Sequence, residues 1–185
     1  MRTPQRILCL AAAAGLTALS AGTAGPAAAQ SEIDASTFSG LEARPIGPAV
    51  MSGRIAAIDG AVGDTTTLYV GTASGGVWRS KDFGITFKPV FDEHTQSIGA
   101  VRVDPKNPQT IWVGTGESCT RNSVSVGDGV YRSTDGGDTW QHLGLQDSER
   151  IASIRVSPAD GNTAWVCATG HLWNDNEERG VYKTT

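Results

Sequence analysis

The sequence predicts an all-β protein of the β-propeller type, with about three antiparallel blades of an incomplete larger propeller. One observation is a repeated stretch. Gly129–Trp140 has the same pattern as Gly76–Phe87, and the first residues of the pattern appear again from Gly180 to Thr185. A second is the spacing, because Ser80 and Ser133 are 53 residues apart and Ser133 and Thr184 are 51 apart. Repeats near this length are typical of propeller blades. A third is the alternation of short β-branched and aromatic runs with turn-forming residues, without helical periodicity.

Alignment of the repeats predicts the strands of each blade, with the outermost strand missing from the third. Blade one, about residues 54–91, is expected to contain strands Arg54–Asp59, Thr66–Thr72, Gly76–Ser80 and Thr86–Phe91. Blade two, about 98–144, is expected to contain Ile98–Asp104, Thr110–Thr115, Asp128–Ser133 and Thr139–Leu143. Blade three, about 151–185, is expected to contain Ile151–Ser157, Thr163–Thr169 and Arg179–Thr184. Three blades do not close a ring, and the sequence stops inside the repeated motif, so we expect either the N-terminal part of a longer propeller or a truncated gene product.

The repeated motif is a strand followed by a turn of fixed chemistry. Its serine and aspartate can bond nearby backbone N–H groups, its glycine permits a positive φ, and its final aromatic residue can pack under the turn. A residue that recurs in every blade serves every blade, whereas an active site needs groups that converge once. We therefore assign structural roles to Ser80, Asp82, Gly84 and Phe87 in the first copy, and to Ser133, Asp135, Gly137 and Trp140 in the second.

This Ser-x-Asp-x-Gly-x-Thr-aromatic pattern resembles the Asp box, or BNR repeat, of sialidases, xyloglucan-specific endoglucanases, sortilin-type receptors and photosystem assembly factors. The run Phe38–Ile58 and the segment Tyr69–Ser80 are similar to the start of large secreted bacterial "glycosyl hydrolase" or sortilin N-terminal-like proteins. The resemblance implies a propeller and leaves open whether the protein is an enzyme. Xyloglucan-specific endoglucanases carry a catalytic carboxylate in a T-D-I-G-G segment, and the matching Thr72–Gly76 has Ala73 in place of the aspartate. The arginine triad and Tyr-Glu pair of sialidases cannot be assigned either.

The N-terminus is expected to direct export. Residues 1–29 read as a secretory signal peptide, with Arg2 and Arg6 before a short apolar run and Ala27–Ala29 at the cleavage site. Residues 30–53 form a lead-in segment broken by proline and glycine. We therefore expect a secreted or periplasmic protein with no membrane span in the mature chain.

Charge and composition narrow the classes of partner. The formal net charge is −4 and no basic cluster is present, which argues against nucleic acid. No cofactor or metal motif is present, since the spacing of Asp175, Glu177 and Glu178 does not match a calcium loop. Cys119 and Cys167 either pair, which export permits, or remain as one free and one buried thiol.

The loops at the opposite end from the repeated turns differ between blades, and such loops usually determine specificity. Trp173 could stack on a sugar or could cover the base of its loop. Glu117 and Glu93 are weak catalytic candidates, since solvated surface carboxylates are the alternative and no paired separation for glycoside hydrolysis is visible. Arg54 and Arg150 each precede a first strand, where they could face a central anion or bind loop carbonyls. The candidate ligand-binding residues are Trp173, His171, Asn174, Arg121 and Asn122.

We therefore expect a propeller segment that binds or scaffolds carbohydrate or an extracytoplasmic protein. The alternative is the N-terminal part of a glycoside hydrolase, sialidase-like or xyloglucanase-like, whose catalytic groups lie mostly in other blades. Fold alone does not decide between these functions.

Overall fold

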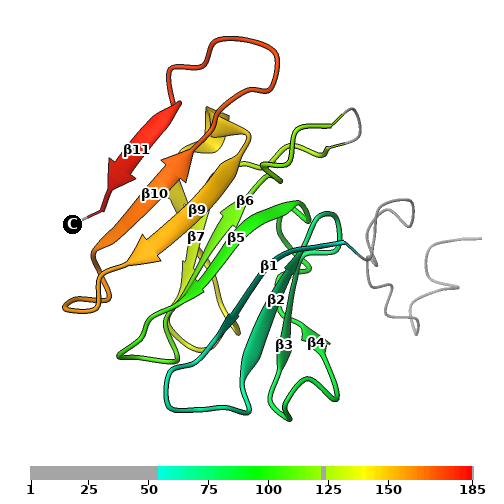
Figure 1. The fold of residues 1–185 in the computed structure, drawn as a ribbon, viewed down its shortest axis with the longest axis vertical. Coiled ribbons are helices and arrows are strands. Elements are labelled where there is room, and N and C mark those ends of the chain that lie inside the picture. The colour runs from blue at the N-terminus through cyan, green and yellow to red at the C-terminus, as the bar shows by residue number, and fades with distance from the viewer. Residues whose placement is uncertain (1–53, 122–123, 185) are drawn as a thin grey trace, which may run out of the picture. The chain divides into compact units, whose positions relative to one another are not determined.

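The computed structural model describes residues 54–121 and 124–184, which form eleven strands in three antiparallel sheets (Figure 1). Sheet 1 contains β1 (Ile55–Gly60), β2 (Leu68–Thr72), β3 (Val77–Ser80) and β4 (Lys88–Pro89). Sheet 2 contains β5 (Ile98–Val103), β6 (Ile111–Thr115), β7 (Val130–Ser133) and β8 (Gln141–Gly144). Sheet 3 contains β9 (Ile151–Val156), β10 (Ala164–Ala168) and β11 (Gly180–Lys183), and a 3₁₀ turn, η2 (Gln146–Ser148), precedes it.

The predicted fold class is confirmed, because strands that follow one another in sequence are neighbours in each sheet. The first two sheets have four strands and the third has three. The predicted signal peptide and lead-in segment lie outside the described residues. Within the described part of the chain, no helix is long and apolar enough to cross a membrane.

The repeats share their strand register as well as their sequence. The pairing of β1 with β2 begins at Ile55↔Thr72, and the pairing of β5 with β6 begins at Ile98↔Thr115. Each pairing then has a β-bulge, because one extra residue of the first strand, Ala56 or Gly99, has no partner in the second strand. In sheet 3, β9 pairs with β10 at Ile151↔Ala168 and shows the same irregularity before Ser153↔Cys167. The three sheets are therefore copies of one unit, and equivalent positions can be compared directly.

Adjacent sheets pack closely at a glycine. In each pair of neighbouring sheets, the first strand of the later sheet contacts a glycine in the second strand of the earlier sheet. A Cβ on Gly71 would lie 2.6 Å from Ile98 Cγ2, and one on Gly114 would lie 2.3 Å from Ile151 Cγ2. Ile98 and Ile151 are fully buried, whereas the equivalent Ile55 is 60% exposed because no described sheet precedes it. The glycine of the repeated Val-Gly-Thr segment thus permits close approach between sheets.

Two apolar clusters follow from this packing. The one between sheets 1 and 2 is centred on Phe91, whose ring meets Tyr131 and Trp140 edge-on at centroid distances of 5.1 and 5.0 Å. The one between sheets 2 and 3 is centred on Trp112 and Ile154. Most of the buried apolar surface therefore lies between sheets, so each sheet depends on its neighbours.

The first strands β1, β5 and β9 contribute neighbouring segments to one narrow cavity of about 160 Å³. Arg102 joins them, because its Nε donates to the Ile154 carbonyl at 3.1 Å and its Nη1 lies 3.5 Å from Asp59 Oδ1. Asp59 Oδ2 also accepts from the Val103 N–H at 2.9 Å. First strands at the centre and fourth strands outside are the arrangement of propeller blades.

The turn between the first and second strands, which was expected from its turn-forming residues, also contains a repeated side-chain contact that was not predicted from the sequence. Asp64 accepts from the Thr67 hydroxyl at 2.5 Å, and Asp160 accepts from the Thr163 hydroxyl at 2.8 Å. At the equivalent position in sheet 2 the Asn107 amide donates to the Thr110 hydroxyl at 3.1 Å. The short pattern Asp/Asn-x-x-Thr could have predicted this contact. It was missed because aspartate, asparagine and threonine are common in loops of any kind.

Candidate functional site

The repeated turns and the variable loops lie at opposite ends of the sheets. At the turn end, the Phe83 N–H donates to the Thr66 carbonyl at 3.1 Å, and the Gly136 N–H donates to the Gln109 carbonyl at 2.8 Å. In sheets 1 and 2, these bonds join the turn between the third and fourth strands to the turn between the first and second strands. The longer connections, which include residues 116–121, 124–129 and 169–179, therefore lie at the other end, which we call the loop end.

The aspartate of each repeated motif, Asp82 or Asp135, is engaged by its own turn. Asp135 Oδ1 accepts from the backbone N–H groups of Asp138 and Thr139 at 3.0 and 2.9 Å, and Oδ2 accepts from the Thr139 hydroxyl at 2.5 Å. Ser133 donates to Asp135 Oδ1 at 2.7 Å and accepts from the Gly137 N–H at 2.8 Å. The hydroxyl of Thr139 above all, with these N–H groups, holds the pKa of Asp135 well below its usual range. The first copy repeats the arrangement around Ser80, Asp82, Gly84 and Thr86.

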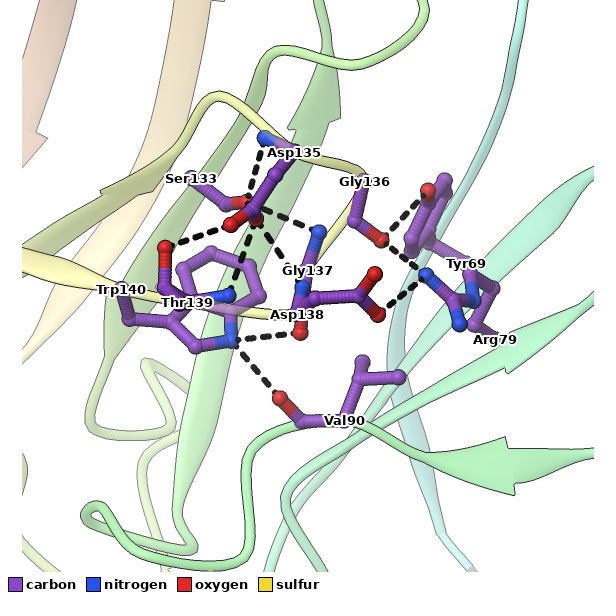
Figure 2. A network of polar contacts seen from close by, with 10 residues as sticks. All are labelled: Tyr69, Arg79, Val90, Ser133, Asp135, Gly136, Gly137, Asp138, Thr139 and Trp140. Atoms are coloured by element: carbon purple, nitrogen blue, oxygen red, sulfur yellow. Dashed lines mark hydrogen bonds and ion pairs between the residues drawn. The ribbon is translucent and has the colours of Figure 1, made fainter.

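The turn between β7 and β8, which is the second copy of the repeated motif, also binds sheet 1, as Figure 2 shows. Arg79 Nη1 donates to the Gly136 carbonyl at 2.7 Å and to Asp138 Oδ1 at 3.0 Å, and the Tyr69 hydroxyl donates to the same carbonyl at 3.0 Å. Trp140 Nε1 donates to the Val90 carbonyl at 2.7 Å. The turn is thus a clasp between sheets 1 and 2. In the first copy Phe87 is 41% exposed, since no described sheet precedes it.

At the loop end, Glu117 is a buried carboxylate that faces an arginine. Its side chain is 5% exposed, and it forms an ion pair with Arg54 Nη2. Its backbone N–H donates to the Ser97 hydroxyl at 3.1 Å, and that hydroxyl donates to the Ser125 carbonyl at 2.9 Å. The interpretation of Glu117 as a solvated surface group is therefore wrong. Because this carboxylate is already engaged by the Arg54 guanidinium, its geometry suits a positioning role better than that of a general acid.

Arg150, the counterpart of Arg54 in sheet 3, is also buried and paired. Its Nη1 lies 2.5 Å from Glu149 Oε2 and 3.5 Å from the Gly170 carbonyl. Glu149 has a φ of 57°, a left-handed conformation that non-glycine residues rarely adopt. Its carbonyl passes so close to Gly116 that a Cβ there would lie only 1.7 Å away. The link between sheets 2 and 3 is therefore held rigidly at the loop end.

The loop 169–179 is fixed from beneath by one arginine and carries an exposed tryptophan. Arg179 Nη2 donates to the His171 and Asn174 carbonyls at 2.8 and 3.2 Å, and its Nε donates to the Thr169 carbonyl at 2.9 Å. Trp173 is 77% exposed. The alternative in which this ring covers the base of its loop is therefore wrong.

His171 holds the same loop against the link before sheet 3. Its Nε2 lies 3.0 Å from the Asp147 carbonyl and 3.7 Å from Glu149 Oε1. The Asn176 amide donates to the Asp147 carbonyl at 2.9 Å. These bonds use one edge of His171, while Trp173 on the same loop remains open to solvent. The ties made by Arg179 and Asn176 were not predicted, because contacts to loop carbonyls leave no sequence motif.

The remaining candidates are not brought together into a catalytic set. Glu93 is exposed and lines a groove of about 530 Å³. The groove lies between β4 and the turn that joins β7 to β8, and Trp140 and Asp138 of that turn also line it. Arg121 is exposed, and Asn122 lies outside the described residues. Within residues 54–121 and 124–184, no three His, Cys, Asp or Glu side chains are placed to hold a metal ion.

Two further positions bear on chemistry at the loop end. Ala73, where the endoglucanase pattern has its aspartate, is 3% exposed, and its N–H donates to the Arg54 carbonyl at 3.0 Å.

Cys119 and Cys167 are both free thiols, the first exposed and the second half-buried. The disulfide left open by the sequence is not formed.

The curated proteins to which this chain is similar include proteins named xyloglucanase. No family model matches the chain. A "Xyloglucanase Xgh74A" from Acetivibrio thermocellus is 31% identical over 157 residues, and a "Xyloglucanase" from a Paenibacillus species is 28% identical over 147 residues. Each alignment covers 64% of this chain but only 17% and 14% of the respective relative, so the chain spans about a sixth of their length.

Solved structures support the same fold. A GH74 enzyme from Niastella koreensis matches 70% of this chain with a TM-score of 0.52 and 24% identity, over 20% of its own length. An ancestral GH74 enzyme matches 71% of this chain with a TM-score of 0.55 and 22% identity, over 17% of its own length. The three sheets are therefore consecutive blades of a propeller of the type found in these enzymes.

Proposed function

We propose that this chain is part of an exported glycan-binding propeller, and that its loop end contacts the polysaccharide. Its relatives carry the name xyloglucanase, which makes xyloglucan the first ligand to test. The signal peptide expected at residues 1–29 would place the protein where plant-type polysaccharides are met. The repeated turns, which we propose are Asp boxes, serve the fold and leave the loop end for binding.

The single observation that carries this proposal is the exposed ring of Trp173 on a loop anchored by Arg179, Asn176 and His171. Aromatic faces bind sugars by covering their C–H surfaces, and a loop whose backbone is already held in place loses little freedom on binding. Asn174 lies beside it and is exposed, so its amide can bond hydroxyl groups. Arg121 and Asn122, on the loop of sheet 2, are proposed as further contacts.

Titration calorimetry of the full chain with xyloglucan oligosaccharides tests this proposal. Trp173→Ala should weaken binding by roughly tenfold or more, the effect of losing a stacked aromatic ring. It should leave the unfolding midpoint unchanged, because the ring is not packed. The matched control is Trp165→Ala, since Trp165 is a 42% exposed tryptophan on β10 rather than on the loop. Equal loss of binding in both variants, or none in either, would refute the proposed site.

A hydrolase in which other blades supply the catalytic groups is the second candidate, and the names of the relatives favour it. Within the described residues, however, Ala73 cannot supply a carboxylate and Glu117 is already paired with Arg54. Release of reducing sugar from xyloglucan by this chain alone should therefore be absent. Activity that disappears in Glu117→Gln alone would show instead that this carboxylate takes part in the chemistry.

A further inference from the structure

The link between sheets 2 and 3 holds a glutamate in a strained backbone conformation. Glu149 lies between η2 and β9 and has a φ of 57°, and Leu145, at the other end of η2, has a φ of 60°. Residues other than glycine rarely adopt this left-handed conformation. Where they do, the surrounding structure maintains the strain, and such residues are common at binding and catalytic sites. Glu149 is the charged residue of the two.

The link between sheets 1 and 2 has Gln96 at the equivalent position, and the two side chains differ in what they contact. Each residue accepts a glycine N–H at its carbonyl, from Gly76 to Gln96 at 2.9 Å and from Gly127 to Glu149 at 2.7 Å. The Gln96 amide donates to three carbonyls of its own link. An ionised carboxylate only accepts, so Glu149 cannot close its link in this way. Its side chain is therefore free to serve another partner.

One oxygen of the Glu149 carboxylate is bonded and the other is not. Oε2 accepts from Arg150 Nη1 at 2.5 Å. Within residues 54–121 and 124–184, Oε1 makes no hydrogen bond, because His171 Nε2 lies 3.7 Å away, beyond hydrogen-bond distance. The Glu149 side chain is 31% exposed, whereas that of Glu117 is 5% exposed. Glu149 thus offers a positioned acceptor to solvent, and Glu117 does not.

The loop that carries Trp173 lies against this acceptor. His171 Nε2 is 3.0 Å from the Asp147 carbonyl, and since a carbonyl only accepts, Nε2 carries the proton and its edge of the ring faces the link. Arg179 Nη2 donates to the carbonyls on either side of Trp173, at 2.8 and 3.2 Å. Trp173 is two residues from His171, a span of at most about 7 Å. The Trp173 ring and Glu149 Oε1 therefore belong to one surface.

We propose that Glu149 Oε1 accepts a hydroxyl group from the sugar that covers the Trp173 ring, and that this contact selects neutral over acidic glycans. The inference rests on the proposed function, because it takes Trp173 as the place where the ligand binds. A sugar hydroxyl can donate to Oε1, whereas an ionised uronate or sulfate group has no proton to donate and is repelled by this oxygen. The ligand class is accordingly a neutral oligosaccharide rich in hydroxyl groups.

Titration calorimetry of the full chain with a matched pair of ligands tests the proposal. The neutral ligand is a xyloglucan oligosaccharide, and the acidic ligand is the same oligosaccharide with its free hydroxymethyl groups oxidised to carboxylates. The wild type should bind the neutral ligand at least about tenfold more tightly. Glu149→Gln should weaken neutral binding by about threefold to tenfold, because a charge-assisted hydrogen bond becomes a neutral one. It should also reduce the preference to about threefold or less, since an amide can donate to a carboxylate.

Asp147→Asn is the matched control, because it removes the same charge from the same link and leaves the Asp147 carbonyl bonded to His171 and Asn176. It should change neutral binding by less than about twofold. The unfolding midpoint of Glu149→Gln should stay near that of the wild type, since the amide oxygen can still accept from Arg150.

The outcomes separate this inference from the proposed function. Equal weakening of both ligands in Glu149→Gln would overturn the inference, because Glu149 would then be only a structural partner of Arg150. Binding that is lost in Trp173→Ala but unchanged in Glu149→Gln would overturn it too, with the proposed function intact. A wild type that binds neither ligand would contradict both.

Discussion

The carboxylates at the two ends of the sheets have different partners. Asp64 and Asp135 at the turn end accept from hydroxyl and N–H groups within their own turns. Glu117 at the loop end instead pairs with Arg54, which lies 63 residues away in the sequence. The first kind of contact is local and follows from a short sequence pattern. The second depends on the fold, which is why sequence reasoning found the turn and missed this ion pair.

At the residue scale, the pH dependence of Asp64 tests the turn contacts. The Thr66 hydroxyl, followed by that of Thr67, lowers the pKa of Asp64 to about 2. A folded-state pKa below the unfolded value of about 3.9 contributes stability above about pH 4, which is lost as the pH falls towards 2. The difference in urea midpoint between the wild type and Asp64→Asn should therefore shrink over that interval. A difference that stays constant from pH 7 to pH 2 would contradict this account.

Glu117 gives the second prediction at this scale. Glu117→Gln leaves the Arg54 guanidinium without its carboxylate in a mostly buried site, which should lower the free energy of unfolding by about 1–3 kcal/mol, given that Arg54 is 30% exposed. Glu93→Gln is the matched control, since Glu93 is exposed and its change should have little effect. Urea denaturation of the three proteins measures the difference. Equal stability of all three would show that the ion pair contributes nothing.

At the scale of the element, the strands were predictable and their packing was not. Alignment of the repeats, each with its short β-branched and aromatic runs, predicted all eleven strands to within a few residues at each end. The reason for the repeated Val-Gly-Thr segment emerged only from the distances of Gly71 and Gly114 to isoleucines of the next sheet. At the same position sheet 3 has Cys167, where no described sheet approaches.

Gly114→Ala tests this packing. The added methyl group would collide with the buried Ile151 side chain, so the free energy of unfolding should fall by about 1–3 kcal/mol. Gly60→Ala is the control, because a Cβ there lies 3.4 Å from the nearest atom, a Leu68 methyl group. Thermal unfolding with chemical denaturation measures both variants. Equal effects of the two changes would show that the approach of β9 to β6 is looser than described.

At the scale of the whole molecule, the turns at one end of the sheets share one sequence pattern, and the loops at the other end differ from sheet to sheet. The repeat in the sequence predicted this division, because turns of one pattern must share one end of an up-and-down sheet. It also indicated Trp173 and His171 as loop-end residues. It could not predict that Trp173 is exposed or that Arg179 fixes its loop, because both depend on how residues 169–179 fold against the Asp147 segment.

Hydrogen exchange of the full chain with and without a xyloglucan oligosaccharide tests the central claim, that the turns serve the fold and the loops serve binding. Exchange should slow in residues 169–179 and in the neighbouring segments 116–121, 124–129 and 145–150. It should be unchanged in the turns 81–87 and 134–140, whose N–H groups are already bonded within the fold. Protection that appears at the turns and not at the loops would contradict the account.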